Sequence, residues 1–132
     1  MDAVNEATSI KIPARPEYIG VARLIIAAFA GFFGFGDEEI EDIKIAVSEA
    51  CTSAILQLHK ETRLEKPTVE IASYLRDHKL VIDVKYGAKE AAPVPPAEKD
   101  LGMSILTCIM DKVEIIRAKD HGTILRLIKD IP

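Results

Sequence analysis

The sequence predicts an α+β fold: a two-layer α/β sandwich in which a mixed, mostly antiparallel sheet is covered on one face by three helices. Short runs of alternating apolar and polar residues lie near both ends of the chain and in its middle, and long stretches with helical spacing separate them. The strand-like runs also adjoin in pairs across short turns, which is typical of antiparallel hairpins. In the resulting order, β-α-α-β-β-α-β-β, three helices cannot all serve as crossovers between parallel strands.

The first half of the chain predicts one strand and two helices. "TSIKIP" (8–13) alternates and stops at a proline, as a short strand does. In "RPEYIGVARLIIAAFAGFFGFG" (15–36) apolar residues recur at helical spacing, with Pro16 acceptable in the first turn and glycines at the end. The next helix, 37–60, has acidic residues in its first turn and His59 and Lys60 in its last, which suits the helix dipole at both ends.

The second half predicts two hairpins around a third helix. "PTVEIASYL" (67–75) and "KLVIDVKY" (79–86) are joined by "RDH", and "VEIIRA" (113–118) and "GTILRLIKDI" (122–131) by "KDHG". "LGMSILTCIMDK" (101–112) has helical spacing at Leu101, Ile105, Cys108 and Ile109. Three prolines in "GAKEAAPVPPAEKD" (87–100) predict an irregular loop or lid.

Composition predicts a single cytoplasmic domain spanning residues 1–132. Hydrophobic residues make up 48% and charged residues 29%, close to the average of globular chains. A net charge of -4 disfavours nucleic-acid binding through phosphate neutralisation. The longest apolar run, "LIIAAFAGFFGF", is much shorter than a membrane span of about 20 residues, so no membrane is expected. Cys51 and Cys108 are expected to be buried thiols, the three histidines to be solvated, and no metal-ligand spacing is found.

Four segments together resemble one known family. "KIPARPEYIGVARLIIAAF", "GDEEIEDIKIAVSEACTSA", "DLGMSILTCIMDKVEI" and "GTILRLIKDI" are similar, in order and spacing, to the anti-sigma factor serine kinases of the RsbW and SpoIIAB type. That family belongs to the histidine-kinase-like ATP-binding domains, whose fold agrees with the element order predicted above. The resemblance covers nearly the whole chain, with "DEEIEDIKIAVSEACT" as its most specific part.

The resemblance implies a catalytic helix at residues 37–60. In the family this helix presents a glutamate that acts as base toward a serine hydroxyl and, one turn later, an asparagine that ligates magnesium. Glu49 matches the glutamate, but Ser53 stands in place of the asparagine. Because Mg²⁺ demands near-ideal octahedral geometry and a hydroxyl is a shorter, weaker ligand than a carboxamide, the metal site is expected to be weakened. The bland alternative for Glu49 is a glutamate at the edge of a buried helix face.

The family's adenine-binding motif is an aspartate followed by a glycine at the end of the middle hairpin. The matching positions are Lys85 and Gly87. An ammonium group has donors only, so Lys85 cannot accept a hydrogen bond from the adenine amino group. Asp83 could substitute only if the strand slipped in register.

The family's phosphate-binding glycines precede the last helix. Here "EKDLGM" keeps Gly102 but has Lys99 and Asp100 at the preceding positions, and Asp100 could equally be an ordinary helix cap. Thr123 matches a family threonine near the nucleotide, although a strand threonine needs no special reason. Three contacts to the nucleotide are thus altered: the metal ligand, the acceptor for the base and the phosphate loop. If each change weakened nucleotide binding by about 1.5 kcal/mol, the three together would weaken it about a thousandfold or more.

The resemblance also implies protein partners. In the family an arginine on the first helix contacts partners, and Arg23 matches it, with a solvated surface arginine as the alternative. All four phenylalanines lie within "AAFAGFFGFG", so an exposed patch for a partner or a second copy is plausible. Family members are similar in forming dimers, and a homodimer is expected.

Two functions from different classes follow, and a third stays open. The leading one is an anti-sigma-factor-like regulatory protein that binds a sigma factor or its antagonist, with nucleotide binding weak or lost and no cofactor expected. The alternative is an active serine kinase that uses Glu49, ATP and Mg²⁺ to phosphorylate the antagonist. The third is a homodimeric scaffold module in a larger assembly.

Overall fold

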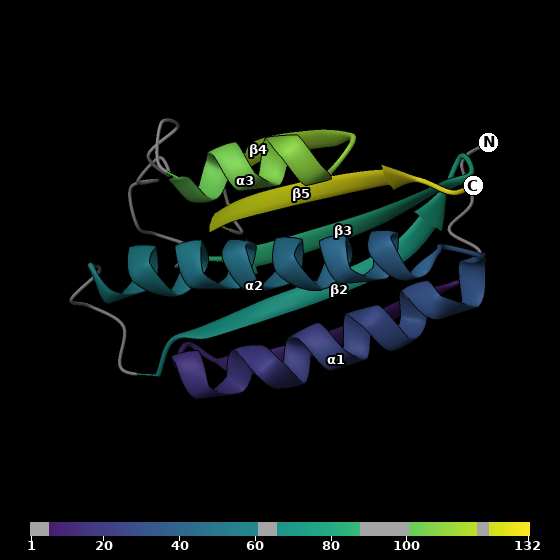
Figure 1. Ribbon diagram of the computed structural model, residues 1–132. Coiled ribbons are helices and arrows are strands. Elements are labelled where there is room, and N and C mark those ends of the chain that lie inside the picture. The colour runs from purple at the N-terminus through teal and green to yellow at the C-terminus, as the bar shows by residue number, and fades with distance from the viewer. Residues whose placement is uncertain (1–5, 61–65, 88–100, 119–121) are drawn as a thin grey trace.

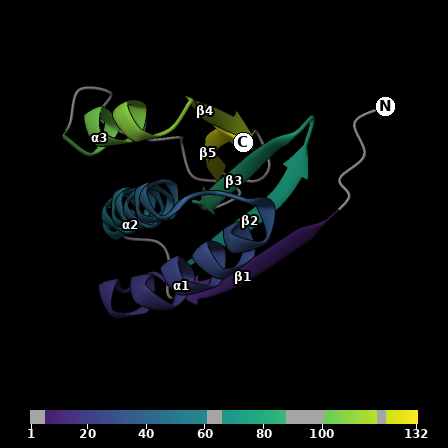
Figure 2. The same cartoon turned by 45° about the vertical axis from the view of Figure 1, so that its right-hand side comes forward.

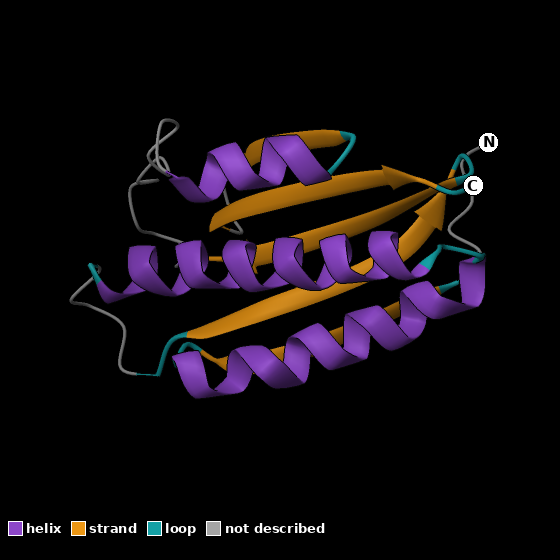
Figure 3. Ribbon diagram, in the orientation of Figure 1, coloured by secondary structure: helices purple, strands orange, loops and turns teal. Residues whose placement is uncertain are grey.

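The computed structural model describes residues 6–60, 66–87, 101–118 and 122–132 and places three helices against one sheet (Figure 1). The predicted order of elements is confirmed, and 3₁₀ turns at Pro16–Tyr18 and Gly31–Phe33 flank the first helix. The elements are β1 (Ala7–Pro13), α1 (Ile19–Ala30), α2 (Asp37–His59), β2 (Thr68–Arg76), β3 (Lys79–Tyr86), α3 (Leu101–Ile109), β4 (Lys112–Ala118) and β5 (Gly122–Asp130). Figure 3 shows the same elements by type.

The sheet has five strands in the order β1-β2-β3-β5-β4, and all four neighbouring pairs are antiparallel. The sheet is therefore entirely antiparallel, whereas a mixed, mostly antiparallel sheet was expected from the sequence. The reason is that β4 is the edge strand and is joined to β5 by a hairpin. Strand β5 then lies beside β3 and runs antiparallel to it.

The β2–β3 hairpin turns within two residues, Asp77 and His78, whose φ angles are 52° and 63°. Positive φ at both central residues is the backbone that a two-residue hairpin needs, and aspartate and histidine tolerate it better than most side chains.

All three helices cover one face of the sheet, and they are seen beside it in Figure 2. Side chains alternate along each strand, so every second residue points toward the helices. On β3 these are Leu80, Ile82, Val84 and Tyr86, all of which belong to the buried core. The helices contribute, among others, Ala22, Ile26, Ile43, Val47, Ala50, Ala54, Leu58 and Leu106 to the same cluster.

Helix α2 lies between α1 and α3 and is the longest helix, with 23 residues (Figure 1). Three acidic residues occupy its first turn, and the Glu39 carboxylate accepts a hydrogen bond from the Gly36 amide at 3.1 Å. These features satisfy a free amide and complement the dipole at the helix start, as the sequence predicted. At the other end, Nε2 of His59 donates to the Ala14 carbonyl oxygen at 2.9 Å and ties α2 to the segment after β1.

The stretch Pro16–Phe33 is, by length and composition alone, apolar enough to cross a membrane. In the fold, the α1 part of this stretch packs against α2 and β1. Such a stretch was not expected from the sequence, because the longest uninterrupted apolar run of the chain begins only at Leu24.

The two cysteines differ in environment, although both were expected to be buried. Cys51 is fully buried in α2, whereas Cys108 is exposed on α3. The buried side chains of α3 and the turn after it are Leu106 and Met110, so the helix turns Cys108 outward. Burial raises the pKa of the Cys51 thiol to about 12.

We expect the two thiols to react at different rates. In the folded protein a thiol-exchange reagent should modify Cys108 quickly and Cys51 only after unfolding, because the thiolate is the nucleophile and burial opposes its formation. The raised pKa of Cys51 also predicts that stability is fully present below pH 9.0, its ordinary pKa, and declines as the pH rises toward about 12. Absorbance of the released thiol measures the first effect, and a Cys51→Ala variant is its control. Rapid modification of both thiols in the native protein would contradict the expectation.

Candidate functional site

Helix α2 places Glu49 and Ser53 on the same side, four residues apart and both partly buried. Lys44, Ser48 and Glu49 line a groove with residues of α1. Lys44 and Ser48 lie on the α1 side of α2, and Glu49 lies between that side and Ser53. At 100° per residue, Ser53 lies on the flank opposite Lys44. Because α2 lies between α1 and α3 (Figure 1), this flank faces α3. The structure thus keeps the pair that the sequence analysis singled out and directs Ser53 toward α3.

Lys85 does not join this pair, which corrects the interpretation made from the sequence. It lies on β3 between Glu70 of β2 and Ile124 of β5, in register with both. Its neighbours Val84 and Tyr86 point toward the helices, so the Lys85 side chain points to the opposite face of the sheet. There it lines a shallow hollow with Lys11 and Glu70. Its ammonium group therefore cannot face a ligand held between the sheet and α2.

Asp83 is also committed elsewhere. Arg126 binds its carboxylate with two hydrogen bonds, of 2.8 Å and 3.0 Å, and the Tyr74 hydroxyl donates a third at 3.0 Å. These contacts lie on the helix-free face and hold β3 in register with β2 and β5, so Asp83 cannot slip into the position of a base acceptor. The pKa of Tyr74 is raised, mainly by burial and then by the Asp83 carboxylate, and hydrogen bonding to Asp83 raises the pKa of Arg126.

Tyr86 and Thr123 face the helices at the end of β3 and the start of β5. They are cross-strand partners, 4% and 3% exposed, and Tyr86 belongs to the core cluster. Next to them the backbones of Gly87 and Gly122 approach closely, with φ angles of 103° and 77°. Since Lys85 points away, the bulky ring of Tyr86 is what β3 presents to the helices at its end.

Of the other residues singled out from the sequence, some lie within the described part of the chain and some do not. Gly102 lies in the first turn of α3 and is partly buried. Lys99, Asp100, the proline-rich loop and His121 lie outside the described residues. His59 and His78 are exposed, as expected.

The residues fit a magnesium ion poorly. Within the described part of the chain, no group of three His, Cys, Asp or Glu side chains could hold a metal. Ser53 supplies a hydroxyl where Mg²⁺ would be better served by a carboxylate or carboxamide oxygen.

Restoring a carboxamide tests the importance of Ser53. We expect Ser53→Asn to tighten binding of ATP about tenfold when Mg²⁺ is present, because asparagine offers a longer and stronger oxygen ligand. The gain should vanish when EDTA removes the metal. Calorimetric titration measures both conditions, and an equal gain with and without Mg²⁺ would show that the substitution acts by another route.

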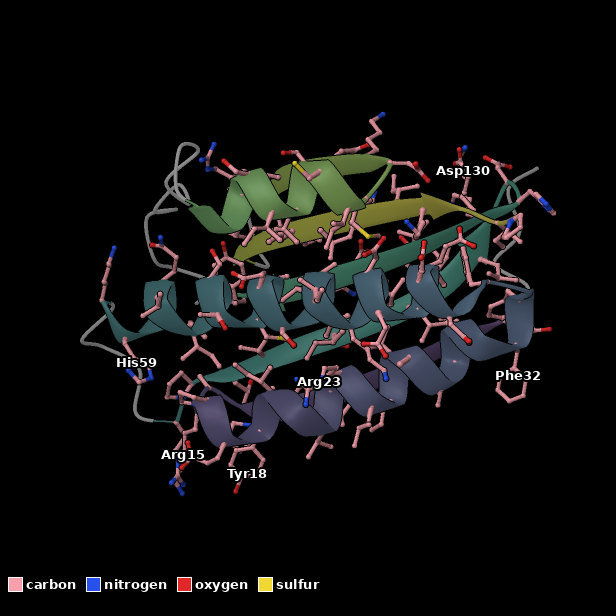
Figure 4. All side chains as sticks on the ribbon, in the orientation of Figure 1. Arg15, Tyr18, Arg23, Phe32, His59 and Asp130 are labelled. Carbon is pink, nitrogen blue, oxygen red and sulfur yellow. The ribbon has the colours of Figure 1, made fainter. Side chains whose placement is uncertain are left out.

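A groove between α1 and α2 brings Arg23 and Glu49 to one surface. Its other lining residues are Leu24, Glu41, Lys44, Ile45 and Ser48. Leu24 is 63% exposed and Ile45 is 45% exposed, so two large apolar side chains face solvent beside the two charged ones. Figure 4 shows Arg23 on α1.

The phenylalanine-rich stretch is mostly packed. Phe35 is buried, and Phe29 and Phe33 pack against the core and meet edge to face at 5.0 Å. Only Phe32 is fully open, at 80% exposed, and it projects from the end of the helical layer in Figure 4. The expected apolar patch is therefore reduced to Phe32 at this end.

One polar residue at the site escaped the sequence analysis. Gln57 lies one turn beyond Ser53 on the same side of α2 and is 7% exposed, and its buried Oε1 has no hydrogen-bond partner among the residues that the structure describes. Leaving such a group unpaired costs about 1–3 kcal/mol. The signal in the sequence was a third polar residue at the same spacing, Glu49, Ser53, Gln57, in a helix whose neighbouring positions are apolar.

Comparison with known proteins agrees with the resemblance. A family model described as a histidine kinase-like ATPase domain matches residues 12–129. The serine-protein kinase RsbW of Bacillus pumilus (strain SAFR-032) is 34% identical over 131 residues, covering 87% of this chain and 81% of the relative. That of Bacillus subtilis (strain 168) is 30% identical over 120 residues, covering 80% and 75%. That of Oceanobacillus iheyensis is 30% identical over 136 residues, covering 92% and 85%. The chain therefore belongs to the histidine kinase-like ATPase family and, within it, to the RsbW type.

Proposed function

We propose that this chain is an anti-sigma-factor-like regulatory protein, which acts by binding proteins in a bacterial partner-switching pathway while its nucleotide binding is weak or lost. The partners are a sigma factor, its antagonist or both, and the protein works in the cytoplasm, as a homodimer. The resemblance supports the class of partner, and Ser53 supports the loss of metal-dependent nucleotide binding.

The α1–α2 groove is the observation that carries the proposal. Arg23, the arginine that matches the family's partner contact, lies there beside the exposed side chains of Leu24 and Ile45. Isolated exposed apolar residues need no explanation, but here two of them line the same groove together with charged residues. Buried apolar anchors ringed by charged residues are the usual make-up of protein–protein contacts.

A pair of matched leucines tests the groove. Leu24 and Leu56 are 63% and 60% exposed, but only Leu24 lines the groove. Purified sigma factors and candidate antagonists of the source bacterium would be assayed by biolayer interferometry against the wild type, Leu24→Glu, Leu56→Glu and Arg23→Ala. We expect Leu24→Glu to weaken the affinity for the bound partner about 30-fold, because its carboxylate would be desolvated in the contact. Leu56→Glu should have no effect.

Two results would count against the proposal. One is equal loss of binding in both leucine variants, and the other is the absence of binding to every sigma factor and antagonist. If the bound antagonist were instead phosphorylated in the presence of Mg²⁺ and ATP, with loss in Glu49→Gln, the kinase alternative would hold.

A further inference from the structure

We infer that a second copy of this chain binds along the edge of the molecule formed by α1 and β1, so that the sheet continues from one protomer into the other and the two α1 helices pack across the junction. This inference deepens the proposed function, because it names the surface that joins the homodimer. The side chains that carry it are not among those that line the α1–α2 groove.

The first argument is the outer face of α1, which is exposed although it is apolar. The only charged residue of α1 is Arg23, which lines the groove toward α2. The stretch Pro16–Phe33 is apolar enough to span a membrane, yet only 22% of it is buried. Five residues recur on the outer face at alternating spacings of three and four: Tyr18, Val21, Ile25, Ala28 and Phe32. A stripe at this spacing is the pattern by which one helix packs against another.

The second argument is the free edge of β1, which is the outermost strand beside β2. Directly after β1, the Ala14 amide donates to the Pro67 carbonyl oxygen at 2.9 Å, and this pair continues the register of the two strands. Because hydrogen-bonded positions alternate along an antiparallel ladder, three residues of β1 direct their N–H and C=O groups away from β2: Ala7, Ser9 and Lys11. A second β1, antiparallel to the first and centred on Ser9, satisfies these groups.

The third argument is that both contacts form in the same dimer. Helix α1 contacts β1 and β2 and lies above the gap between them, at the edge of the molecule (Figure 2). Paired strands lie about 4.8 Å apart. If β1 pairs with its copy about a twofold axis perpendicular to the sheet, α1 lies about one strand spacing from that axis. The two α1 helices are then antiparallel and about 10 Å apart, which is a usual distance between packed helices.

A second copy suits this edge better than a membrane surface does. Helices that lie on a membrane carry several lysines and arginines on the polar face, whereas α1 has Arg23 alone. The stripe also has an aromatic residue at each end, and Tyr18 and Phe32 both project on the side of α1 away from α2 (Figure 4). It therefore presents a similar pattern in both directions, as the two identical surfaces of an antiparallel pair require.

Sedimentation equilibrium of the full chain tests this surface. Val21 and Leu56 are 45% and 60% exposed, and neither lines the α1–α2 groove. We expect Val21→Glu to raise the dissociation constant of the dimer about 100-fold, because twofold symmetry desolvates one carboxylate from each copy. Leu56→Glu, which places the same charge on α2, should leave the dissociation constant unchanged.

Hydrogen exchange followed by nuclear magnetic resonance tests the strand pairing. In the wild-type dimer the amides of Ser9 and Lys11 should exchange slowly, because they donate to β1 of the second copy. In monomeric Val21→Glu these two amides should exchange rapidly. The amides of Ile10 and Ile12, which donate to β2, should stay slow in both samples and show that the variant remains folded.

Three results would overturn the inference: a wild type that stays monomeric at about 100 µM, a dimer that Val21→Glu does not weaken, and rapid exchange of Ser9 and Lys11 in the dimer. Binding of a monomeric wild type to phosphatidylglycerol vesicles, lost in Val21→Glu, would assign the stripe to a membrane and would also overturn it. The proposed function fails by a different result, namely the absence of binding to every sigma factor and antagonist, so the two failures are distinguishable.

Discussion

Replacing Gly122 with alanine is expected to lower the free energy of unfolding by about 3 kcal/mol. The backbone of Gly122 has a φ of 77°, which L side chains rarely adopt, and an added Cβ would overlap the Tyr86 carbonyl oxygen and lie 2.9 Å from that of Gly87. Both obstacles are backbone atoms, one in the last residue of β3 and one directly after it, so they can move only if the end of β3 separates from β5. Urea unfolding followed by circular dichroism measures the change.

Two other glycines separate the causes of this effect. Gly34 has a φ of 84° but open space around it, so Gly34→Ala should show the conformational part alone, about 1 kcal/mol. Gly31 has a φ of -60° and also open space, so Gly31→Ala should be neutral or slightly stabilising. If Gly122→Ala were no worse than Gly34→Ala, the close approach of β3 and β5 would be wrong.

Removing the Asp83 carboxylate is expected to destabilise the fold by a similar amount, about 3 kcal/mol. Asp83→Ala leaves Arg126 without its two hydrogen bonds and Tyr74 without its acceptor. The Asp83 side chain is only 4% exposed, but Arg126 is 24% exposed and regains some water, so the effect belongs at the lower end of the range for broken buried pairs. Chemical unfolding measures this loss.

A double variant and a surface pair serve as controls. Asp83→Leu combined with Arg126→Leu should recover most of the loss, because two apolar side chains leave no unpaired charge. Breaking the exposed pair of Lys79 and Asp130 by Lys79→Ala should leave stability almost unchanged, because solvent screens both charges. The pKa of Tyr74 should also fall in Asp83→Ala, since the carboxylate contributes to raising it. An unchanged Tyr74 titration would contradict the network.

The order of elements could be predicted because the local signals agree with the fold. The acidic first turn and apolar stripe of α2 and the turn at Asp77 and His78 each specify structure from nearby residues alone. The direction of all strands could not be predicted, because the pairing of β3 with β5 joins residues more than 35 positions apart.

The candidate site could be predicted only where helical spacing decides it. The helical period of α2 predicts that Glu49 and Ser53 lie on one side of the helix. The face of the sheet to which the Lys85 side chain points could not be predicted. On β3, Val81 and Asp83 are 4% and 3% exposed, almost as buried as the residues that face the helices. The apolar pattern therefore does not reveal which face of this strand points inward.

Calorimetric titration of the wild type with Mg-ATP tests the central claim most directly. We predict a dissociation constant of about 1 mM or weaker, with no change when EDTA replaces Mg²⁺. Submillimolar binding that disappears in EDTA would show that the chain retains a working metal-nucleotide site and would contradict the account.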